Sequence, residues 1–128
     1  MQTILVLDDE PGILRLVSVM LEKKGYRVLS AANGDQALRL CDVNPQIDLL
    51  LTDVIAPGMS GPMIADEVVV RKPGIKILFM SGYDGSQVVQ RYVVEQGHAL
   101  IVKPFTVPDL ARKVESILAG NGTPAENG

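Results

Sequence analysis

Cysteine and histidine are nearly absent from this sequence, which contains one of each among 128 residues. The lone Cys41 cannot form a disulfide within the chain, and we expect it to be a buried thiol on a predicted helix. Single-cysteine usage is typical of a reducing compartment, so we expect a cytoplasmic protein. His98 follows Gly97 and has no phosphotransfer motif beside it, so we expect a solvent-facing loop residue.

Long apolar runs and clustered basic residues are also missing. No apolar run approaches the roughly 18 residues of a membrane span, and no basic stretch with a cleavage site opens the chain. We therefore expect neither membrane insertion nor a secretory signal. The net charge is −3, with dispersed lysines and arginines, so we expect no direct nucleic-acid binding. The sequence also lacks a glycine-rich nucleotide loop ending in Lys-Ser/Thr.

What the sequence does contain is four short apolar runs, within a pattern that alternates strand and helix five times. Runs of this length bounded by turn residues are typical of strands buried on both faces of a parallel sheet. The alternation predicts a doubly wound α/β fold with strand order 2-1-3-4-5. We expect one domain over residues 1–119 and a flexible tail or linker remnant over 120–128. The expected strands are 3–8, 26–31, 47–53, 75–80 and 99–102, and the expected helices are 11–24, 34–43, 60–71, 84–96 and 106–119.

Polar side chains follow four of the five predicted strands. Asp8 and Asp9 follow the first strand, Asp53 ends the third, Ser81 follows the fourth and Lys103 follows the fifth. The predicted order puts strands one and three side by side, so we expect the three carboxylates to meet at one edge. Clustered carboxylates repel one another unless a cation neutralises them, and Mg²⁺ (or Mn²⁺) prefers such oxygen ligands.

This inventory suits phosphoryl transfer, which needs positioning and charge neutralisation. A carboxylate that accepts a phosphoryl group forms an acyl phosphate, and Lys103 and Ser81 can contact phosphoryl oxygens. Each residue also has a simpler interpretation. The segment 8–10 could cap the first helix, Asp53 could be a turn residue, and Lys103-Pro104 could be a solvated strand end with a cis bond. Their occurrence together at strand ends favours a site.

Four segments resemble the receiver domain family of two-component signalling, found in response regulators and hybrid histidine kinases. The resemblance covers residues 3–119 and implies a flavodoxin-like (βα)5 sandwich. Leu78-Phe79-Met80-Ser81-Gly82-Tyr83 is especially similar to receivers attached to hybrid sensor kinases. The four segments are ILVLDDE at 4–10, DVIAPGMSG at 53–61, MSGY at 80–83 and KPF at 103–105.

The resemblance implies a role for each site residue. Asp53 would be phosphorylated by a histidine kinase or a histidine phosphotransfer protein. Asp9 would bind Mg²⁺ directly, Asp8 through water, and the Ile55 backbone carbonyl would be a further ligand.

By the same resemblance, Ser81 and Lys103 would hold the phosphoryl oxygens, and the loop and helix after Ser81 would signal to a downstream protein or an attached domain. Two positions depart from the family pattern. Leu100 stands where an aromatic switch residue is common, and Ala56 stands where Met is frequent. We therefore expect signalling to rely on backbone movement after Ser81.

Two other functions compete with a phosphoacceptor switch. A phosphatase or phosphotransferase with an aspartate nucleophile generally has a second acid two residues later, but Ile55 occupies that position. A phosphorylation-independent binding module would not need an acidic cluster that costs stability without a cation. We therefore expect no enzyme beyond self-phosphorylation and self-dephosphorylation, with any kinase activity outside this chain.

Overall fold

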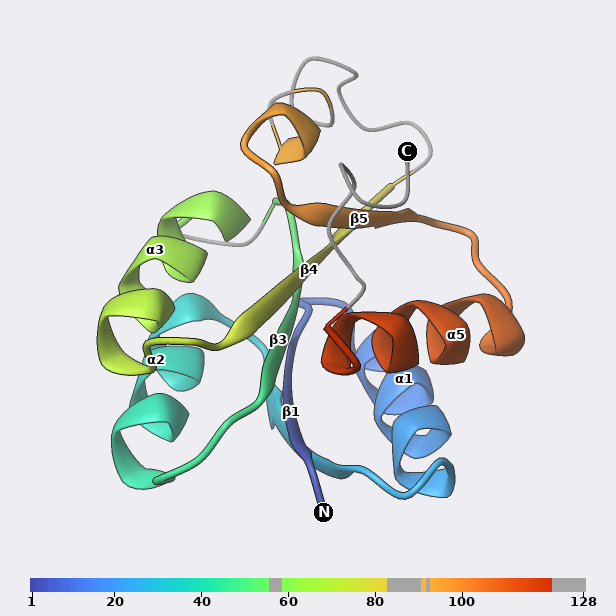
Figure 1. Cartoon of the computed structure of the whole chain (residues 1–128), viewed down its shortest axis with the longest axis horizontal. Helices are drawn as coiled ribbons and strands as arrows, with labels where there is room; N and C mark the ends of the chain where they lie inside the picture. Colours follow the sequence, from blue (N-terminus) through green and yellow to red (C-terminus); the bar gives the residue numbers. More distant parts are fainter. Residues whose placement is uncertain (56–58, 83–90, 92, 121–128) are drawn as a thin grey trace.

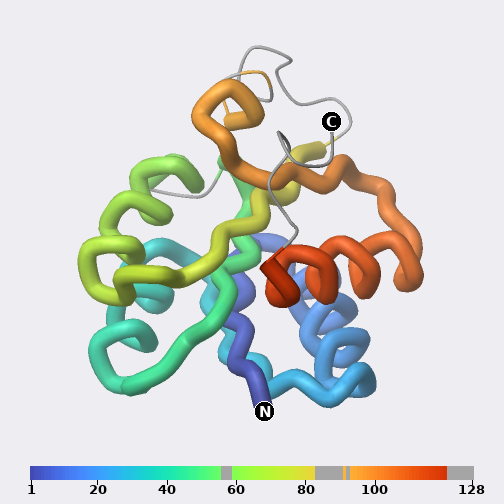
Figure 2. The backbone as a smooth tube through the Cα atoms, viewed as in Figure 1, coloured from blue at the N-terminus to red at the C-terminus, as the bar shows by residue number. Residues whose placement is uncertain are grey.

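The computed structural model describes residues 1–55, 59–82, 91 and 93–120. Its centre is a five-stranded parallel sheet in the order β2-β1-β3-β4-β5, which confirms the predicted order (Figure 1). β1 and β3 run side by side through the middle of the molecule (Figure 2), with Leu7 opposite Thr52. The strands are β1 Thr3–Leu7, β2 Arg27–Ala31, β3 Leu49–Asp53, β4 Lys76–Ser81 and β5 Ala99–Val102.

Helices cover both faces of the sheet (Figure 1). The helices α1 (Pro11–Lys23) and α5 (Val107–Leu118) lie on one face, and α2 (Gly34–Val43) and α3 (Gly61–Arg71) lie on the other. Alternate residues of β1 enter separate cores, with Ile4 and Val6 toward α1 and α5, and Leu5 and Leu7 toward α2 and α3. Burial on both faces explains why the central strands β1 and β3 are made mostly of apolar residues. The helix predicted at 84–96 lies mostly outside the described residues, and within this range residues 91 and 93–95 are described as helical.

Proline, glycine and asparagine residues mark the ends of the helices. Pro11 begins α1, where its missing N–H costs nothing, and Gly25 follows the helix with φ +97°. Asn33 caps α2 by accepting a hydrogen bond from the Gln36 amide at 2.9 Å. Glu10 occupies the N-cap of α1 without a side-chain capping hydrogen bond, so it does not cap the helix as the simpler interpretation supposed.

Two details differ from expectation. β3 begins at Leu49 rather than at residue 47, and just before it the Asp48 carboxylate accepts a hydrogen bond from the Thr3 amide at 2.8 Å. His98 is half-buried rather than solvent-facing, since its ring packs edge-on against Phe79 with centroids 5.2 Å apart. Cys41 is fully buried, as predicted. In the described part of the chain, no helix has the length and apolar character needed to cross a membrane.

Candidate functional site

The carboxyl ends of β1 and β3 bring three carboxylates together. Asp8 and Asp9 follow β1, Asp53 ends β3, and these strands are direct neighbours. One carboxylate oxygen from each residue lies within 4.8 Å of the others. The sheet therefore assembles the acidic cluster that strand order predicted.

The two neighbouring aspartates after β1 have different surroundings. The Asp8 side chain is 0% exposed, and its Oδ1 accepts a hydrogen bond from the Glu10 amide at 2.9 Å. Its Oδ2 accepts one from the Lys103 Nζ at 2.8 Å. Asp9 is exposed. Both Asp8 oxygens are thus engaged within the protein, whereas Asp9 is open to a ligand from solvent.

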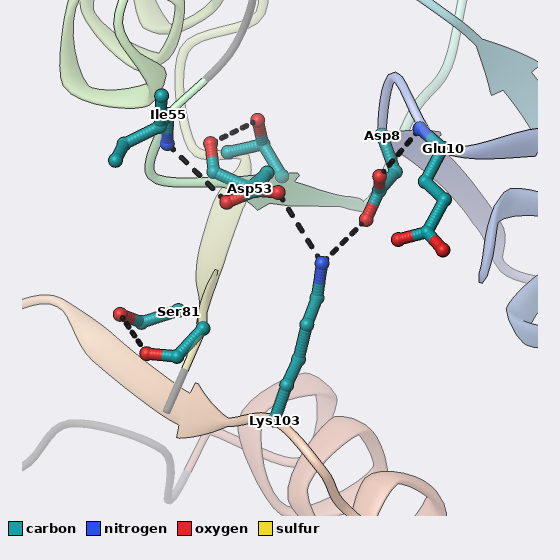
Figure 3. Close-up of polar contacts among 8 residues, drawn as sticks. Asp8, Glu10, Asp53, Ile55, Ser81 and Lys103 are labelled. Carbon is teal, nitrogen blue, oxygen red and sulfur yellow. Dashed lines mark hydrogen bonds and ion pairs between the residues drawn. The ribbon is translucent and has the colours of Figure 1, made fainter. Parts of the chain in front are cut away.

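Lys103 lies between the carboxylates of two strands. Its Nζ contacts Asp8 Oδ2 at 2.8 Å and Asp53 Oδ2 at 3.2 Å (Figure 3). Burial opposes the charged form of Lys103, but the hydrogen bond and charges of Asp8 and Asp53 outweigh it and raise the lysine pKa. Burial raises the pKa of the Asp53 carboxyl, against the lowering effect of the Lys103 charge. The ammonium therefore compensates carboxylate charge inside a partly desolvated site.

The peptide bond between Lys103 and Pro104 is cis, as one of the simpler interpretations allowed. On the other side of Lys103, its backbone amide donates a hydrogen bond to the Ser81 carbonyl at 2.7 Å. The Lys103 side chain is only 19% exposed and reaches the acidic cluster, so this residue is part of the site and not a solvated strand end.

Ser81 borders the cluster from β4. It is buried, and its Oγ donates a hydrogen bond to the Gly82 carbonyl at 3.4 Å. Figure 3 shows this hydroxyl on the opposite side of the Lys103 side chain from Asp8. The sheet therefore brings all five predicted side chains to one edge.

Ile55 sits two residues after Asp53 with its side chain 66% exposed. Its amide donates a hydrogen bond to Asp53 Oδ1 at 3.3 Å (Figure 3). Ile55 also forms an isolated antiparallel bridge with Ser60. Leu100, at the departure from the aromatic pattern, is half-buried and packs into the core beside α2 and α3.

Two neighbours of Asp53 had no predicted role. The fully buried Thr52 donates a hydrogen bond from Oγ1 to the Asp53 carbonyl at 3.0 Å. Gly61 packs against the same carbonyl. For Thr52, the sequence offered one signal of a special role, which was a hydroxyl residue directly after three leucines in a predicted strand. The signal for Gly61 was a helix that starts at glycine directly after the site.

The donor set fits a hard divalent cation. The three carboxylate oxygens are the ligands that Mg²⁺ prefers, and such an ion usually takes one or two carboxylates plus waters and phosphate oxygens. Among the described residues, this is the one group of acidic, histidine or cysteine ligands close enough to hold a metal. The cluster is thus typical of a magnesium site.

Known proteins resemble this chain over most of its length. Sporulation initiation phosphotransferase F of Bacillus subtilis is 31% identical over 91% of this chain and 94% of its own length. Sensor kinase CckA of Brucella abortus is 30% identical over 91% of this chain. This chain spans only 12% of that kinase, and 31% and 51% of two other relatives.

The fold agrees with that of a solved relative. The structure of response regulator TrrA from Thermotoga maritima, in complex with Mg²⁺ and BeF, matches with a TM-score of 0.78 and 32% identity. The match covers 91% of this chain and 99% of that one. The family model for the response regulator receiver domain matches residues 4–115. With its 2-1-3-4-5 sheet and acidic edge, the chain belongs to the receiver domain family of two-component signalling.

Proposed function

We propose that this chain is a phosphoacceptor switch in which Asp53 accepts a phosphoryl group from a histidine kinase or a histidine phosphotransfer protein. The observation that carries the proposal is the position of the Asp53 carboxylate. It lies 3.2 Å from the Lys103 ammonium and within 4.8 Å of the Asp8 and Asp9 oxygens. One cluster thus contains a nucleophile, a fixed cation and the ligands of a divalent ion.

The transfer exchanges one bond to phosphorus for another. An Asp53 carboxylate oxygen forms a bond to phosphorus while the phosphorus–nitrogen bond of the donor phosphohistidine breaks, and the imidazole leaves with the electron pair. Lys103 and Ser81 contact the phosphoryl oxygens, where the ammonium offsets negative charge and the hydroxyl donates a hydrogen bond.

Asp9, Asp53 and the Ile55 carbonyl would hold Mg²⁺ or Mn²⁺, with Asp8 acting through water. When bound, the ion supplies additional charge neutralisation at the phosphoryl oxygens. Asp8 also orients Lys103, since its Oδ2 holds the Nζ at 2.8 Å.

The signal would leave the site through the segment after Ser81. The loop and helix that follow would change when Ser81 engages the phosphoryl group, and a downstream protein or an attached domain would respond. Residues 83–90 of this segment lie outside the described residues. We place the receiver at 1–119, the tail or linker at 120–128 and the protein in the cytoplasm. Any histidine kinase activity would belong to a region beyond this chain.

Labelling of Asp53 tests the proposal. With Mg²⁺ and a small-molecule phosphodonor, the wild type should gain one acid-labile phosphoryl group, and Asp53→Asn should gain none. Asp66→Asn, which changes an exposed carboxylate of α3, should label like the wild type. Full labelling of Asp53→Asn would assign the acceptor elsewhere. Rapid multiple turnover of the donor by the wild type would instead indicate a phosphatase.

A further inference from the structure

We propose that Gly61 is a positioning residue that holds the acceptor segment in place by close backbone contact. The inference rests on the proposed function, because it concerns the geometry of Asp53 and Ile55. Gly61 is the first residue of α3 and is buried. A Cβ at this position would overlap the Asp53 carbonyl oxygen, and it would lie 2.9 Å from the Val54 Cα and 3.0 Å from the Val54 carbonyl oxygen.

These neighbours are backbone atoms, so no side-chain rotation can relieve the overlap. Either α3 or the Asp53–Val54 backbone would have to move. The Gly61 amide also donates a hydrogen bond to the Val54 carbonyl at 2.7 Å, which ties the start of α3 to the residue after the acceptor. Gly61 therefore serves through its missing side chain, since its backbone is not in the left-handed region.

The contact closes a small loop on the site. Ile55 and Ser60, the next residues inward from Val54 and Gly61, form an antiparallel bridge beside the Val54–Gly61 hydrogen bond. On the strand side, the Val54 amide donates to the Met80 carbonyl at 2.9 Å, and Thr52 Oγ1 donates to the Asp53 carbonyl at 3.0 Å. The Asp53 and Ile55 backbone is thus held between β4 and the first turn of α3. A shift on the α3 side would move two of the proposed metal ligands together.

Two other glycines provide matched controls for substitution by alanine. Gly34 also begins a helix and is buried, but a Cβ there would meet the Ile64 Cδ1 at 3.1 Å, a flexible side chain on α3. Gly12 lies in the first turn of α1 with no atom within 4 Å of the added carbon. Gly34→Ala measures the effect of altered packing between α2 and α3. Gly12→Ala measures the effect of a glycine-to-alanine change in a helix where the new methyl group touches nothing.

The experiment compares Mg²⁺ affinity and thermal stability in the three variants and the wild type. Gly61→Ala should weaken Mg²⁺ binding by about tenfold, the loss typical when the support of a metal ligand is removed. Gly34→Ala and Gly12→Ala should bind Mg²⁺ like the wild type, whatever their melting temperatures. Gly61→Ala with wild-type Mg²⁺ affinity would overturn the inference and leave the proposed function intact. A wild type that neither binds Mg²⁺ nor labels at Asp53 would instead overturn the proposed function.

Hydrogen exchange of the wild type provides a second measurement if Gly61→Ala does not fold. Since coupling between sites is reciprocal, saturating Mg²⁺ should slow exchange of the Gly61 amide. The control is the Tyr26 amide, which donates a hydrogen bond to the Leu21 carbonyl at the C-terminal end of α1, the end that does not face the acidic cluster. Equal slowing of both amides, or no slowing of either, would overturn the inference.

Discussion

At the scale of single residues, Lys103 stabilises the fold as well as the site. The Asp8 side chain is 0% exposed and has the Lys103 ammonium 2.8 Å from its Oδ2. Lys103→Ala leaves that carboxylate without its cation, so we expect the free energy of unfolding to fall by about 3 kcal/mol. Urea denaturation without divalent ions measures the loss. Lys24→Ala, at the exposed C-cap of α1, is the control, and an equal effect of both substitutions would contradict the role of Lys103.

Ile55 should lengthen the life of phosphorylated Asp53. Hydrolysis needs a water in line with the phosphorus–oxygen bond, and a branched aliphatic side chain cannot hold that water by hydrogen bonds. Because Ile55 is 66% exposed, its replacement should leave the core intact. Ile55→Asn should lose its acyl phosphate about tenfold faster once the donor is removed. Ile55→Val should decay like the wild type, and an equal or slower rate for Ile55→Asn would refute the idea.

At the scale of elements, the stability of α5 depends on a capping box, the pair of reciprocal hydrogen bonds between Thr106 and Asp109 at its first turn. Thr106 Oγ1 accepts the Asp109 amide at 3.2 Å, and Asp109 Oδ2 accepts the Thr106 amide at 3.4 Å. α5 buries Leu110, Val114 and Ile117 against the sheet, so a frayed start weakens one of the two cores. Thr106→Ala should lower the free energy of unfolding by about 1 kcal/mol. Denaturation at neutral pH measures the change, and a stability equal to wild type would show that the box contributes nothing.

The same box predicts a pH dependence. The hydrogen bonds with the Thr106 side chain and backbone lower the pKa of Asp109 in the folded state. A carboxyl with a depressed folded pKa stabilises the protein above its unfolded pKa and loses that effect as pH falls through the folded value. The wild type should therefore exceed Asp109→Asn in stability at neutral pH, and the difference should begin to shrink below about pH 4 and vanish once pH is below the folded pKa of Asp109. A difference that is constant from pH 7 to pH 3 would exclude this linkage.

At the scale of the whole molecule, the acidic cluster exists only when β1 and β3 are paired. An ion that binds only the folded chain stabilises it by mass action, by about 2.7 kcal/mol at one hundred times its dissociation constant. Saturating Mg²⁺ should thus raise the wild-type melting temperature. Asp9→Ala should reduce the shift because it removes an exposed carboxylate that we propose as a metal ligand, whereas Asp66→Ala should not. An unchanged wild-type melting temperature would rule out the metal site.

Much of the fold was predictable because burial on two faces leaves a local record in the sequence. The strand Leu49–Asp53 is short and opens on three buried leucines, and helix α1 has Pro11 at its start and Gly25 beyond its end. Both signals act over a few residues. The candidate site was predictable for a related reason, since parallel strands deliver their carboxyl ends to one edge and Asp8, Asp9 and Asp53 follow such ends.

The sequence alone determined the order of elements, the receiver resemblance and the residue types at the edge of the sheet, because these depend on local pattern. Only the tertiary structure decided which atoms meet. Lys103 reaches Asp8 across 95 residues of chain, both Asp8 oxygens are engaged while Asp9 stays exposed, and His98 packs on Phe79. Such contacts depend on strand register and loop geometry, which position residues far apart in sequence. Gly61 shows the same limit, since its missing side chain matters only where α3 meets the Asp53 backbone.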